Sequence, residues 1–405
     1  MVQSANRDQR FLFPVNSDLK FLCQALALAR RGYGQTSPNP MVGAVLVKRD
    51  RIIGRGWHRR AGGPHAEIEA LHDAQKRALN PRGATLYVTL EPCCTQGRTP
   101  PCTQAIIAAG IKRVVAGTTD PNPKHAGKGF RILRRAGIAA ECLGDQPDAA
   151  AEKIARECAR LNESFNHWIV RGTPFVTVKA AMTLDGKIAT ADGESKWITG
   201  EKARAQGMTL RHGHDAILVG VNTVVADDPS LTARGPKPSR DGHVRPRRRI
   251  ILDSLARTPL SAKVVSDKQA AATTIVVSRR APLSRVAALA KKVKVVKAPG
   301  PAGKLNLRWL LKRLGAENVA GVLVEGGGEV NASFLLGGLA QRVAFFYAPK
   351  ILGGRDSRKA VAGDGAKRLQ DVLTLREVAW KRLGADLFLT ARVDESPLDA
   401  SRNGH

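Results

Sequence analysis

The sequence has 405 residues, a length that favours two or three domains over one. Hydrophobic residues make up 43% of the chain, enough for ordinary packed cores, but no apolar run reaches the roughly 20 residues that cross a bilayer. The formal net charge of +30 would attract nucleic acid or phosphorylated small molecules, and composition alone does not separate these partners.

The N-terminal segment and the cysteines favour a cytoplasmic protein. Residues 1–16 carry charges but lack the apolar core of a secretory signal, so we interpret them as a flexible leader, and residues 396–405 as a flexible tail. Six cysteines, three of them crowded within ten residues, are not the disulfide framework of a small secreted protein. A metal site in a reducing compartment fits them better.

A first domain is predicted over residues 17–148, where helices and strands alternate. Ser17 is predicted to cap a helix whose apolar positions recur at helical spacing. Strands are expected at 41–47, 52–57, 85–90, 113–117 and 138–142, and helices at 64–77, 101–109 and 130–136. This alternation is typical of a layered α/β domain.

A charged helical segment, residues 149–172, is predicted to link this domain to a second one at 173–395. Strands of the second domain are expected at 175–181, 216–220, 249–253, 274–278, 293–297, 321–325 and 342–348, alternating with helices. Residues 184–187 contain Asp-Gly and are predicted to form a hairpin turn. The basic run at 245–249, in a Gly/Pro/Ser-rich stretch, is interpreted as a solvated surface loop.

The strongest functional signal is His65-Ala66-Glu67, followed by Glu91-Pro92-Cys93 and then Cys102. One imidazole and two thiolates supply three zinc ligands, and a catalytic zinc site keeps its fourth position for water. Zinc acidifies that water toward about pH 7. Glu67 is then placed to carry protons from water to a leaving amine without binding the metal.

Two features bear on the choice of ligands. Cys102 follows two prolines and is predicted to open a helix, whose N-terminus favours a thiolate. Cys94 is a rival to Cys93, but the proline before Cys93 matches the zinc nucleobase deaminases, which carry His-x-Glu, Pro-Cys and Cys in this order. The other cysteines are expected to lie on apolar faces in the core: Cys23, Cys142 and Cys158.

The spacing of the two thiols distinguishes substrates. Nucleic-acid and nucleoside deaminases use Pro-Cys-x-x-Cys, whereas here the second thiol comes nine positions after the first. The loop at 94–101 and the segments at 37–44, 56–58 and 120–123 resemble the deaminase of the riboflavin pathway. The resemblance implies a pocket for the pyrimidine and its phosphate that is lined by Asn39, His58, Arg98, Asp120 and Asn122. From spacing alone, each of these would be a turn residue or a surface group.

One position departs from that family. The family usually carries a histidine two residues after the first cysteine ligand, and this chain has Thr95 there. Threonine keeps a hydroxyl but loses the imidazole. Because the zinc ligands and Glu67 are unaffected, we expect the chemistry to survive, with a possible cost in substrate contact or rate.

A second signal is a glycine turn between a strand and a helix, at Glu325-Gly326-Gly327-Gly328. Glycines let backbone N–H groups approach an anion, and a helix N-terminus favours its charge, so a cofactor pyrophosphate would fit. A plain structural turn explains the glycines equally well. The pattern is not Gly-x-Gly-x-x-Gly, and a Rossmann domain is therefore not indicated.

The segments between 174 and 393 together resemble the reductase domain of the bifunctional riboflavin deaminase/reductase family. The expected α/β architecture is therefore a cytidine-deaminase-like three-layer domain followed by a dihydrofolate-reductase-like domain. The resemblance implies that the phosphorylated substrate is held by Lys179, Ser195, Arg211, Asp227, Leu231, Arg234 and Glu325. It implies that NADPH is held by Ala181, Trp197, Thr223, Asp227, Ser254, Gly327, Gly328, Glu329, Val330, Asn331, Ala332 and Ser333. Lys179 and Asp227 are expected to orient and protonate the reacting sugar, although alone they would be an edge-strand lysine and a turn residue.

The resemblance implies two reactions on phosphorylated pyrimidine substrates. With one zinc ion per chain, the first replaces the C2 amino group of a diaminopyrimidinone ribosyl phosphate with oxygen. With NADPH, the second reduces the ribosyl group to ribityl. A homo-oligomer, dimer or tetramer, through the reductase halves is also implied, with no membrane partner. The alternatives are a nucleic-acid deaminase with a basic surface, and a binding protein whose first site has decayed, as Thr95 would suggest.

Overall fold

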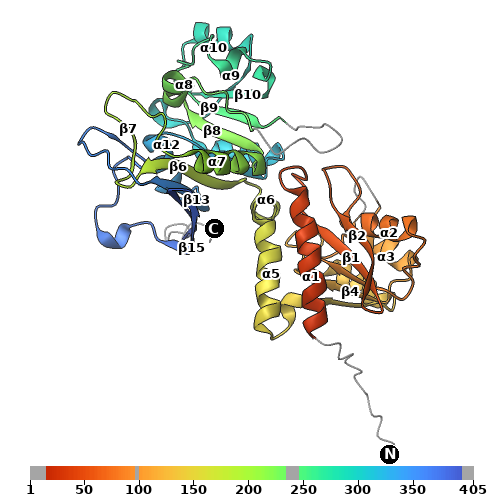
Figure 1. Ribbon diagram of the computed structural model, residues 1–405. Helices are drawn as coiled ribbons and strands as arrows, with labels where there is room; N and C mark the ends of the chain where they lie inside the picture. The colour runs from red at the N-terminus through yellow and green to blue at the C-terminus, as the bar shows by residue number, and fades with distance from the viewer. Residues whose placement is uncertain (1–14, 96–99, 234–245, 395–405) are drawn as a thin grey trace, which may run out of the picture. The chain divides into compact units, whose positions relative to one another are not determined.

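The computed structural model describes residues 15–95, 100–233 and 246–394. The chain forms two compact units, residues 1–166 and 167–405, each built around its own sheet (Figure 1). Within the described residues, no helix is long and apolar enough to cross a membrane.

The first unit contains a five-stranded sheet in the order β2-β1-β3-β4-β5. Its strands are β1 (Gly43–Lys48), β2 (Arg51–Trp57), β3 (Thr85–Val88), β4 (Arg113–Ala116) and β5 (Ala139–Cys142). β1 runs antiparallel to both β2 and β3, whereas β3, β4 and β5 run parallel. All five predicted strands are therefore present, with ends shifted by a few residues.

Helices cover both faces of this sheet, as the predicted layered domain requires. α1 (Val15–Ala29) and α5 (Ala149–Leu161) pack on one face, and α2 (Ala66–Lys76), α3 (Cys102–Ala108) and α4 (Lys128–Arg135) on the other (Figure 1). Side chains alternate along a strand, so Leu46 of β1 joins the core under α2 to α4 while Val45 and Val47 join the core under α1 and α5. Both β1 faces are apolar for this reason.

Three local predictions in this unit were wrong. Ser17 lies inside α1, which begins at Val15, and so it does not cap the helix. Cys23 is exposed on α1, while Cys142 and Cys158 are buried as expected. The segment at 149–172 is not one helix, because Asn162 separates α5 from α6 (Glu163–Arg171). The Asn162 side chain instead accepts from the Met41 N–H (2.7 Å) and donates to the Met41 carbonyl (2.9 Å).

The second unit contains a nine-stranded sheet in the order β11-β10-β9-β8-β12-β6-β13-β16-β15. Its strands are β6 (Phe175–Thr183), β8 (Ala216–Gly220), β9 (Arg248–Leu252), β10 (Thr273–Val277), β11 (Lys294–Lys297), β12 (Gly321–Val324), β13 (Arg342–Ala348), β15 (Leu375–Leu383) and β16 (Asp386–Val393). The first seven strands in this order, from β11 through β6 to β13, run parallel. β16 and β15 add an antiparallel edge. The seven predicted strands are confirmed, and β15 and β16 are two further strands of this sheet that were not predicted.

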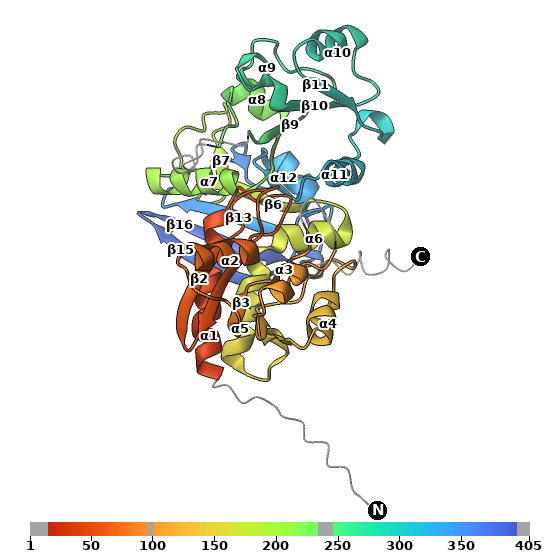
Figure 2. The same cartoon turned by 90° about the vertical axis from the view of Figure 1, so that its right-hand side faces the viewer.

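Helices also sandwich this second sheet. α11 (Leu307–Ala316) and α12 (Gly328–Leu335) pack on one face, and α8 (Val221–Asp227), α9 (Lys263–Ser266) and α10 (Leu283–Ala290) on the other. Figure 2 shows α8, α9 and α10 gathered around β9 to β11. α7 (Glu201–Gly213) packs against β13 and β16. Short 3₁₀ turns complete the chain at Arg30–Gly32, Leu143–Asp145, Ala270–Ala272, Pro301–Gly303 and Leu369–Asp371.

The Asp-Gly turn after β6 forms as predicted, but it does not make a hairpin. Gly186 has the expected positive φ of 78°. The strand that follows, β7 (Lys187–Ala189), pairs with β14 (Arg358–Lys359) in a separate two-stranded sheet. The turn therefore redirects the chain out of the large sheet instead of folding it back on β6.

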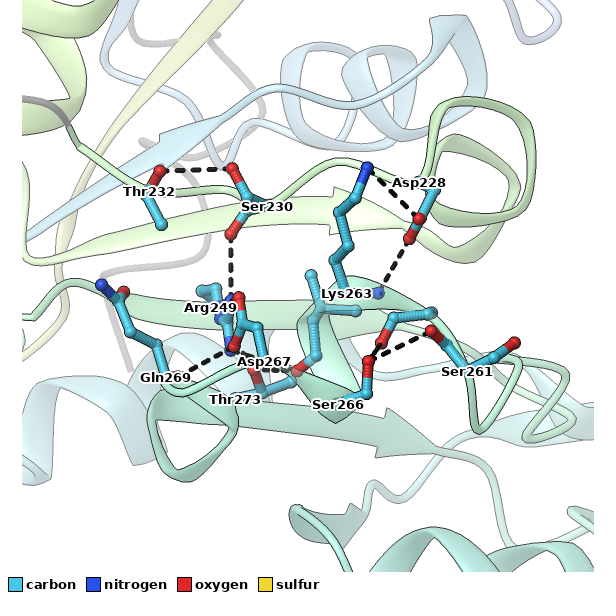
Figure 3. Close-up of polar contacts among 12 residues, drawn as sticks. Asp228, Ser230, Thr232, Arg249, Ser261, Lys263, Ser266, Asp267, Gln269 and Thr273 are labelled. Atoms are coloured by element: carbon cyan, nitrogen blue, oxygen red, sulfur yellow. Dashed lines mark hydrogen bonds and ion pairs between the residues drawn. The ribbon is translucent and has the colours of Figure 1, made fainter.

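The basic run at 245–249 was interpreted wrongly as a solvated loop. Arg245 lies outside the described residues, but Arg247 is buried and donates to the His212 carbonyl (2.6 Å), and Arg248 and Arg249 belong to β9. The Arg249 side chain is fully buried, at 0% exposure. Figure 3 shows three of its polar partners, which are Asp267 (2.7 and 2.8 Å), the Thr273 hydroxyl (2.8 Å) and the Ser230 carbonyl (3.0 Å). The Val264 carbonyl (3.2 Å) is a further acceptor.

Candidate functional site

The predicted metal ligands come together in the first unit. His65 is the residue before α2, Cys102 is the first residue of α3, and Cys93 lies in the segment that follows β3. The His65 Nδ1 atom lies 3.4 Å from the Cys93 sulfur and 3.3 Å from the Cys102 sulfur, and all three ligand atoms lie within 4.8 Å of one another. Within the described part of the chain, this is the one group of such residues close enough to share an ion.

Close packing of α2 on β2 sets the position of His65. A Cβ atom at Gly54 would lie 2.3 Å from the Ala70 carbonyl oxygen, and one at Gly56 would lie 2.2 Å from the Ala66 carbonyl oxygen. Only glycine lets the helix backbone approach the strand this closely. The start of α2, with His65 beside it, is thereby held directly over the sheet.

The donor set fits zinc. Zinc–nitrogen bonds of about 2.0 Å and zinc–sulfur bonds of about 2.3 Å place tetrahedral N and S ligands about 3.5 Å apart, close to the separations seen here. The hydrogen bond from Cys102 lowers the pKa of Cys93 to about 4, so this sulfur is a thiolate near neutral pH. The N–H of Cys102, at the start of α3, also donates to the Cys93 sulfur (3.3 Å). The N-terminus of α3 thus stabilises the Cys93 thiolate. The sequence predicted this effect for Cys102, but the hydrogen bond to Cys93 and burial raise the pKa of Cys102.

Glu67 lies in the first turn of α2 beside these ligands. Its side chain is buried, and burial raises its pKa to about 7, with the negative charge of Cys93 adding to the effect. It also interacts with the Cys102 thiol. A carboxyl group with a pKa near neutrality can both accept and release a proton at physiological pH, which is the property that the predicted role demands.

Cys94 does not belong to the ligand cluster. Its sulfur lies 3.5 Å from Nδ1 of His125, which comes from a different loop, and burial raises its pKa. The geometry therefore favours Cys93 as the ligand, in agreement with the prediction from the Pro-Cys motif.

Serine substitutions test this choice of ligand. Cys93→Ser and Cys102→Ser each remove a thiolate ligand, so we expect zinc affinity to fall at least by the roughly 100-fold that loss of an outer-shell partner can cost. Cys94→Ser is the matched control and should keep about one zinc ion per chain. Zinc content after dialysis against a chelator, measured by mass spectrometry, decides the matter. Zinc loss from Cys94→Ser with retention in Cys93→Ser would show the opposite assignment.

Two predicted pocket residues lie next to the metal ligands. His58 is buried, and its ring contacts the His65 ring edge to face, with the centroids 5.4 Å apart. Its Nδ1 donates to the Pro64 carbonyl (2.9 Å), and its Nε2 accepts from the Asn39 amide (3.2 Å). Burial lowers the pKa of His58, so this neutral tautomer persists near pH 7.

Asp120 and Asn122 lie on one loop, and Glu91, whose role was not predicted, binds the backbone of this loop. Glu91 is buried, and its carboxylate accepts from the N–H groups of Asp120 (3.1 Å), Gly127 (2.9 Å) and Gly129 (2.8 Å). Asp120 in turn accepts from the Asn122 N–H (2.9 Å), and burial raises its pKa. Glu91 is two residues before Cys93, so it connects the segment of this metal ligand to the loop. Arg98 lies outside the described residues.

In the second unit, three predicted substrate residues form one charged cluster. Glu325, just after β12, is held by two hydrogen bonds from Arg211 of α7 (2.8 and 2.7 Å) and lies 4.0 Å from Lys179 of β6. Burial opposes ionisation of Glu325, but Lys179 and Arg211 outweigh it and lower its pKa to about 2. β6 lies between β12 and β13, so Lys179 is not an edge-strand lysine, and the cluster keeps one surplus positive charge.

The other predicted substrate residues of this unit lie apart or in the core. The Ser195 hydroxyl donates to Asp227 at the end of α8 (3.1 Å), and Lys196 lies 3.7 Å from the same carboxylate. The Leu231 side chain is only 2% exposed and packs in the core under α8, so it offers no side-chain contact to a ligand. Arg234 lies outside the described residues.

The predicted NADPH residues follow the carboxyl ends of adjacent parallel strands. Ala181 is near the end of β6, Thr223 follows β8, Ser254 follows β9 and Gly327 follows β12. These strands are neighbours in the order β9-β8-β12-β6, and ligands of parallel sheets bind at this edge. Trp197 is 67% exposed, and the Arg204 guanidinium lies 4.8 Å from its ring centre.

The glycine turn leaves room for an anion at Gly327, whereas Gly326 is packed against Val330 and Gly328 against the Lys359 carbonyl. Gly327 precedes α12, and a Cβ atom placed on it would meet nothing within 4 Å. The first N–H groups of the helix have no intrahelical partner, so this end fits a pyrophosphate. Asn331 and Ala332 are buried, and the Ser333 hydroxyl donates to the Glu329 carbonyl (2.7 Å). In this turn, the backbone is therefore better placed for a cofactor than these side chains.

Comparisons with known proteins agree with both halves. A family model for the cytidine and deoxycytidylate deaminase zinc-binding region matches residues 15–118, and one for the RibD C-terminal domain matches residues 174–389. The riboflavin biosynthesis protein RibD of Aquifex aeolicus is 43% identical over 92% of this chain and 97% of its own length. That of Escherichia coli is 37% identical over 92% of this chain and 98% of its own length.

Solved structures show the same fold. Acinetobacter baumannii RibD is 35% identical, with a TM-score of 0.80 over 94% of this chain and 99% of its own. A diaminohydroxyphosphoribosylaminopyrimidine deaminase/5-amino-6-(5-phosphoribosylamino)uracil reductase of Thermotoga maritima is 34% identical, with a TM-score of 0.76 and the same coverage. The expected cytidine-deaminase-like domain followed by a dihydrofolate-reductase-like domain is confirmed. With this identity over more than nine-tenths of the chain, the protein belongs to the RibD family of riboflavin biosynthesis proteins.

Proposed function

We propose that the chain catalyses two successive steps of riboflavin biosynthesis. The first is zinc-dependent deamination of 2,5-diamino-6-(5-phosphoribosylamino)pyrimidin-4(3H)-one, and the second is NADPH-dependent reduction of the ribosyl group to ribityl. One observation carries the proposal: a His65, Cys93 and Cys102 centre with Glu67 beside it is joined in one chain to a RibD-type reductase domain. We assign the deaminase to residues 17–148, the link to 149–172 and the reductase to 173–395.

In the deaminase half, each residue has a distinct task. Zinc held by the three ligands would make water nucleophilic near neutral pH. Glu67 takes a proton from that water and delivers it to the leaving amino group, which departs as ammonia while oxygen takes its place on the ring. Neutral His58 lies against the ligand His65 and carries the Asn39 amide with it, and Asp120 and Asn122 supply polar groups for the pyrimidine and its phosphate.

In the reductase half, the chain binds and orients. NADPH held at the Gly327 turn would supply the hydride, which goes to C1′ of the opened ribosyl group. Lys179 carries a positive charge that Glu325 fixes in place, and it can hold or give a proton at the sugar oxygen. Asp227, bonded to Ser195, is the second group proposed to orient the sugar. The surplus positive charge of the Lys179, Glu325 and Arg211 cluster suits a phosphorylated substrate.

The partners follow from this chemistry. Phosphorylated pyrimidines are the proposed substrates, and the large net charge would favour their approach without a nucleic-acid partner. The family alignments extend over the reductase half, which a nucleic-acid deaminase does not need. We also propose a cytoplasmic location, which the six free cysteines support, and a dimer or tetramer formed through the reductase halves.

Incubation with the diaminopyrimidinone phosphate, first without and then with NADPH, tests both reactions. Ammonia should appear without NADPH, because the first reaction needs only water. NADPH absorbance should then fall when the cofactor is added, because the deaminated product becomes the substrate of the second half. Ammonia release without later NADPH oxidation would refute the reductase, and the absence of ammonia from zinc-loaded protein would refute the deaminase.

A further inference from the structure

The loop that carries Asp120 and Asn122 also carries a histidine that neither reaction uses. The His125 ring is partly exposed, and both of its nitrogens face the two residues that directly follow the ligand Cys93. Nε2 lies 3.2 Å from the Thr95 hydroxyl oxygen, and Nδ1 lies 3.5 Å from the Cys94 sulfur. One imidazole thus connects two segments that are about 30 positions apart in the sequence.

The backbone around His125 is itself well fixed. The His125 N–H donates to the Asn122 carbonyl (2.8 Å), and the Asn122 side chain accepts from the Lys124 N–H (3.0 Å). Glu91 holds the loop before and after this point, at the N–H groups of Asp120 and Gly127. The ring therefore projects from an anchored turn, and contacts with it can transmit the position of that turn.

The Cys93 segment is consequently attached to the loop on both sides of the metal ligand. Glu91, two residues before Cys93, binds the loop through its carboxylate, and Cys94 and Thr95, directly after Cys93, meet it through His125. The Glu91 attachment acts on the loop backbone alone, through the N–H groups of Asp120, Gly127 and Gly129. The second attachment fixes the separation between the metal ligand and the two proposed substrate residues.

We propose that His125 is a positioning residue of the deaminase, acting through Thr95 to hold Asp120 and Asn122 at the correct distance from the metal centre. The proposal rests on the deaminase function proposed above. It also gives Thr95 a partner, because this chain places an imidazole against the threonine hydroxyl from the opposite loop. Thr95 is then one half of a pair, and not a sign of decay.

Removing the ring should affect substrate binding more than chemistry. In His125→Ala, the zinc ligands, Glu67 and the Glu91 bonds all remain, so kcat for ammonia release should change little. KM should rise about tenfold, because small misplacements of binding groups have effects of this size or larger. His125→Gln can place an amide near the position of Nε2 and should recover most of the loss. The reductase in the same chain and the zinc content report that the variants are folded.

A double-mutant cycle with Thr95→Val gives the decisive measurement. Valine keeps the shape of threonine but removes the hydroxyl, so it should raise KM in the same direction as His125→Ala. The double variant should be no worse than His125→Ala alone, because both changes break one contact. His72→Ala, on the exposed side of α2, is the matched control and should behave as the unmodified protein.

Other outcomes have distinct meanings. Independent, multiplying effects of the two substitutions would overturn the proposal, as would an unchanged KM in His125→Ala. Loss of zinc or of reductase activity in His125→Ala and His125→Gln alike would show a structural role, which also overturns it. If the unmodified, zinc-loaded protein released no ammonia, the deaminase function would fail before the role of His125 came into question.

Discussion

Glu67→Gln should abolish ammonia release while leaving the zinc content and NADPH consumption unchanged. Glutamine keeps the size and the burial of the side chain but cannot take up or deliver a proton. General acid–base catalysis contributes about 10²- to 10⁴-fold, and this residue handles both the proton from water and the proton to the amine, so we expect a loss of about 10³-fold or more in kcat. Ammonia release from the diaminopyrimidinone phosphate measures the first reaction, and NADPH oxidation with chemically deaminated substrate measures the second.

Glu69→Gln provides the matched control for this prediction. Glu69 lies two residues further along α2, and its carboxylate pairs with Arg59 (3.2 Å), whose side chain is 54% exposed. Its substitution should change the deaminase rate less than about threefold, because surface ion pairs contribute little. A Glu67→Gln variant that keeps a substantial rate with normal zinc content would mean that another group moves the protons. The first reaction as proposed would then be wrong in its central step.

The metal centre could be predicted from the sequence because its chemistry depends on a few residue types at fixed places. His65 and Cys102 each stand at the start of a helix, and Cys93 follows a buried strand, so three local patterns converge on one edge of the sheet. Parallel strands deliver the residues after them to the same edge. For the same reason, the strand ends that carry Thr223, Ser254 and Gly327 lie at one edge of the second sheet.

Other parts of the site depend on contacts that no local pattern reveals. Glu91 binds N–H groups as many as 38 positions away, and His125 meets Thr95 across 30 positions. The charged faces of β15 gave no alternating apolar signal, since this strand lies at the edge of the sheet and is exposed along most of its length. Each of these residues depends on a partner that is distant in the sequence, and a local pattern does not identify that partner.

The basic run at 245–249 is the clearest example. Charge density predicts exposure only if the charges have no partners, and the partner of Arg249 is Asp267, which lies 18 positions away beyond α9. Val264 and Thr273, on either side of Asp267, complete the ring of acceptors around the guanidinium. The sequence around Asp267 gives no sign that this segment surrounds an arginine of β9.

Arg249→Ala should therefore destabilise the reductase unit strongly. The substitution leaves a cavity in a buried strand and removes the donors from Asp267 and from the carbonyls of Ser230 and Val264. Asp267 is 27% exposed and can be solvated after the change, so the loss comes mainly from the cavity and the unpaired carbonyls. Truncating a large buried side chain to alanine costs about 2–5 kcal/mol. Hydrogen exchange of β9 and β10 in increasing urea measures the free energy of local and global opening in this unit. Ammonia release by the deaminase unit should persist, since the polar partners of Arg249 all belong to the second unit.

Arg248→Ala is the matched control, because it removes the same side chain from the neighbouring position of the same strand. Arg248 pairs with Glu317 at the surface, with 39% of its side chain exposed, and Glu317 retains Lys294 and Arg313 as partners when Arg248 is removed. The free energy of unfolding should fall by less than about 1 kcal/mol, as for other exposed pairs. Equal losses for the two variants would mean that charge in β9, and not burial, sets the stability. A loss confined to Arg249→Ala would show that one arginine of a strongly basic run belongs to the structural core.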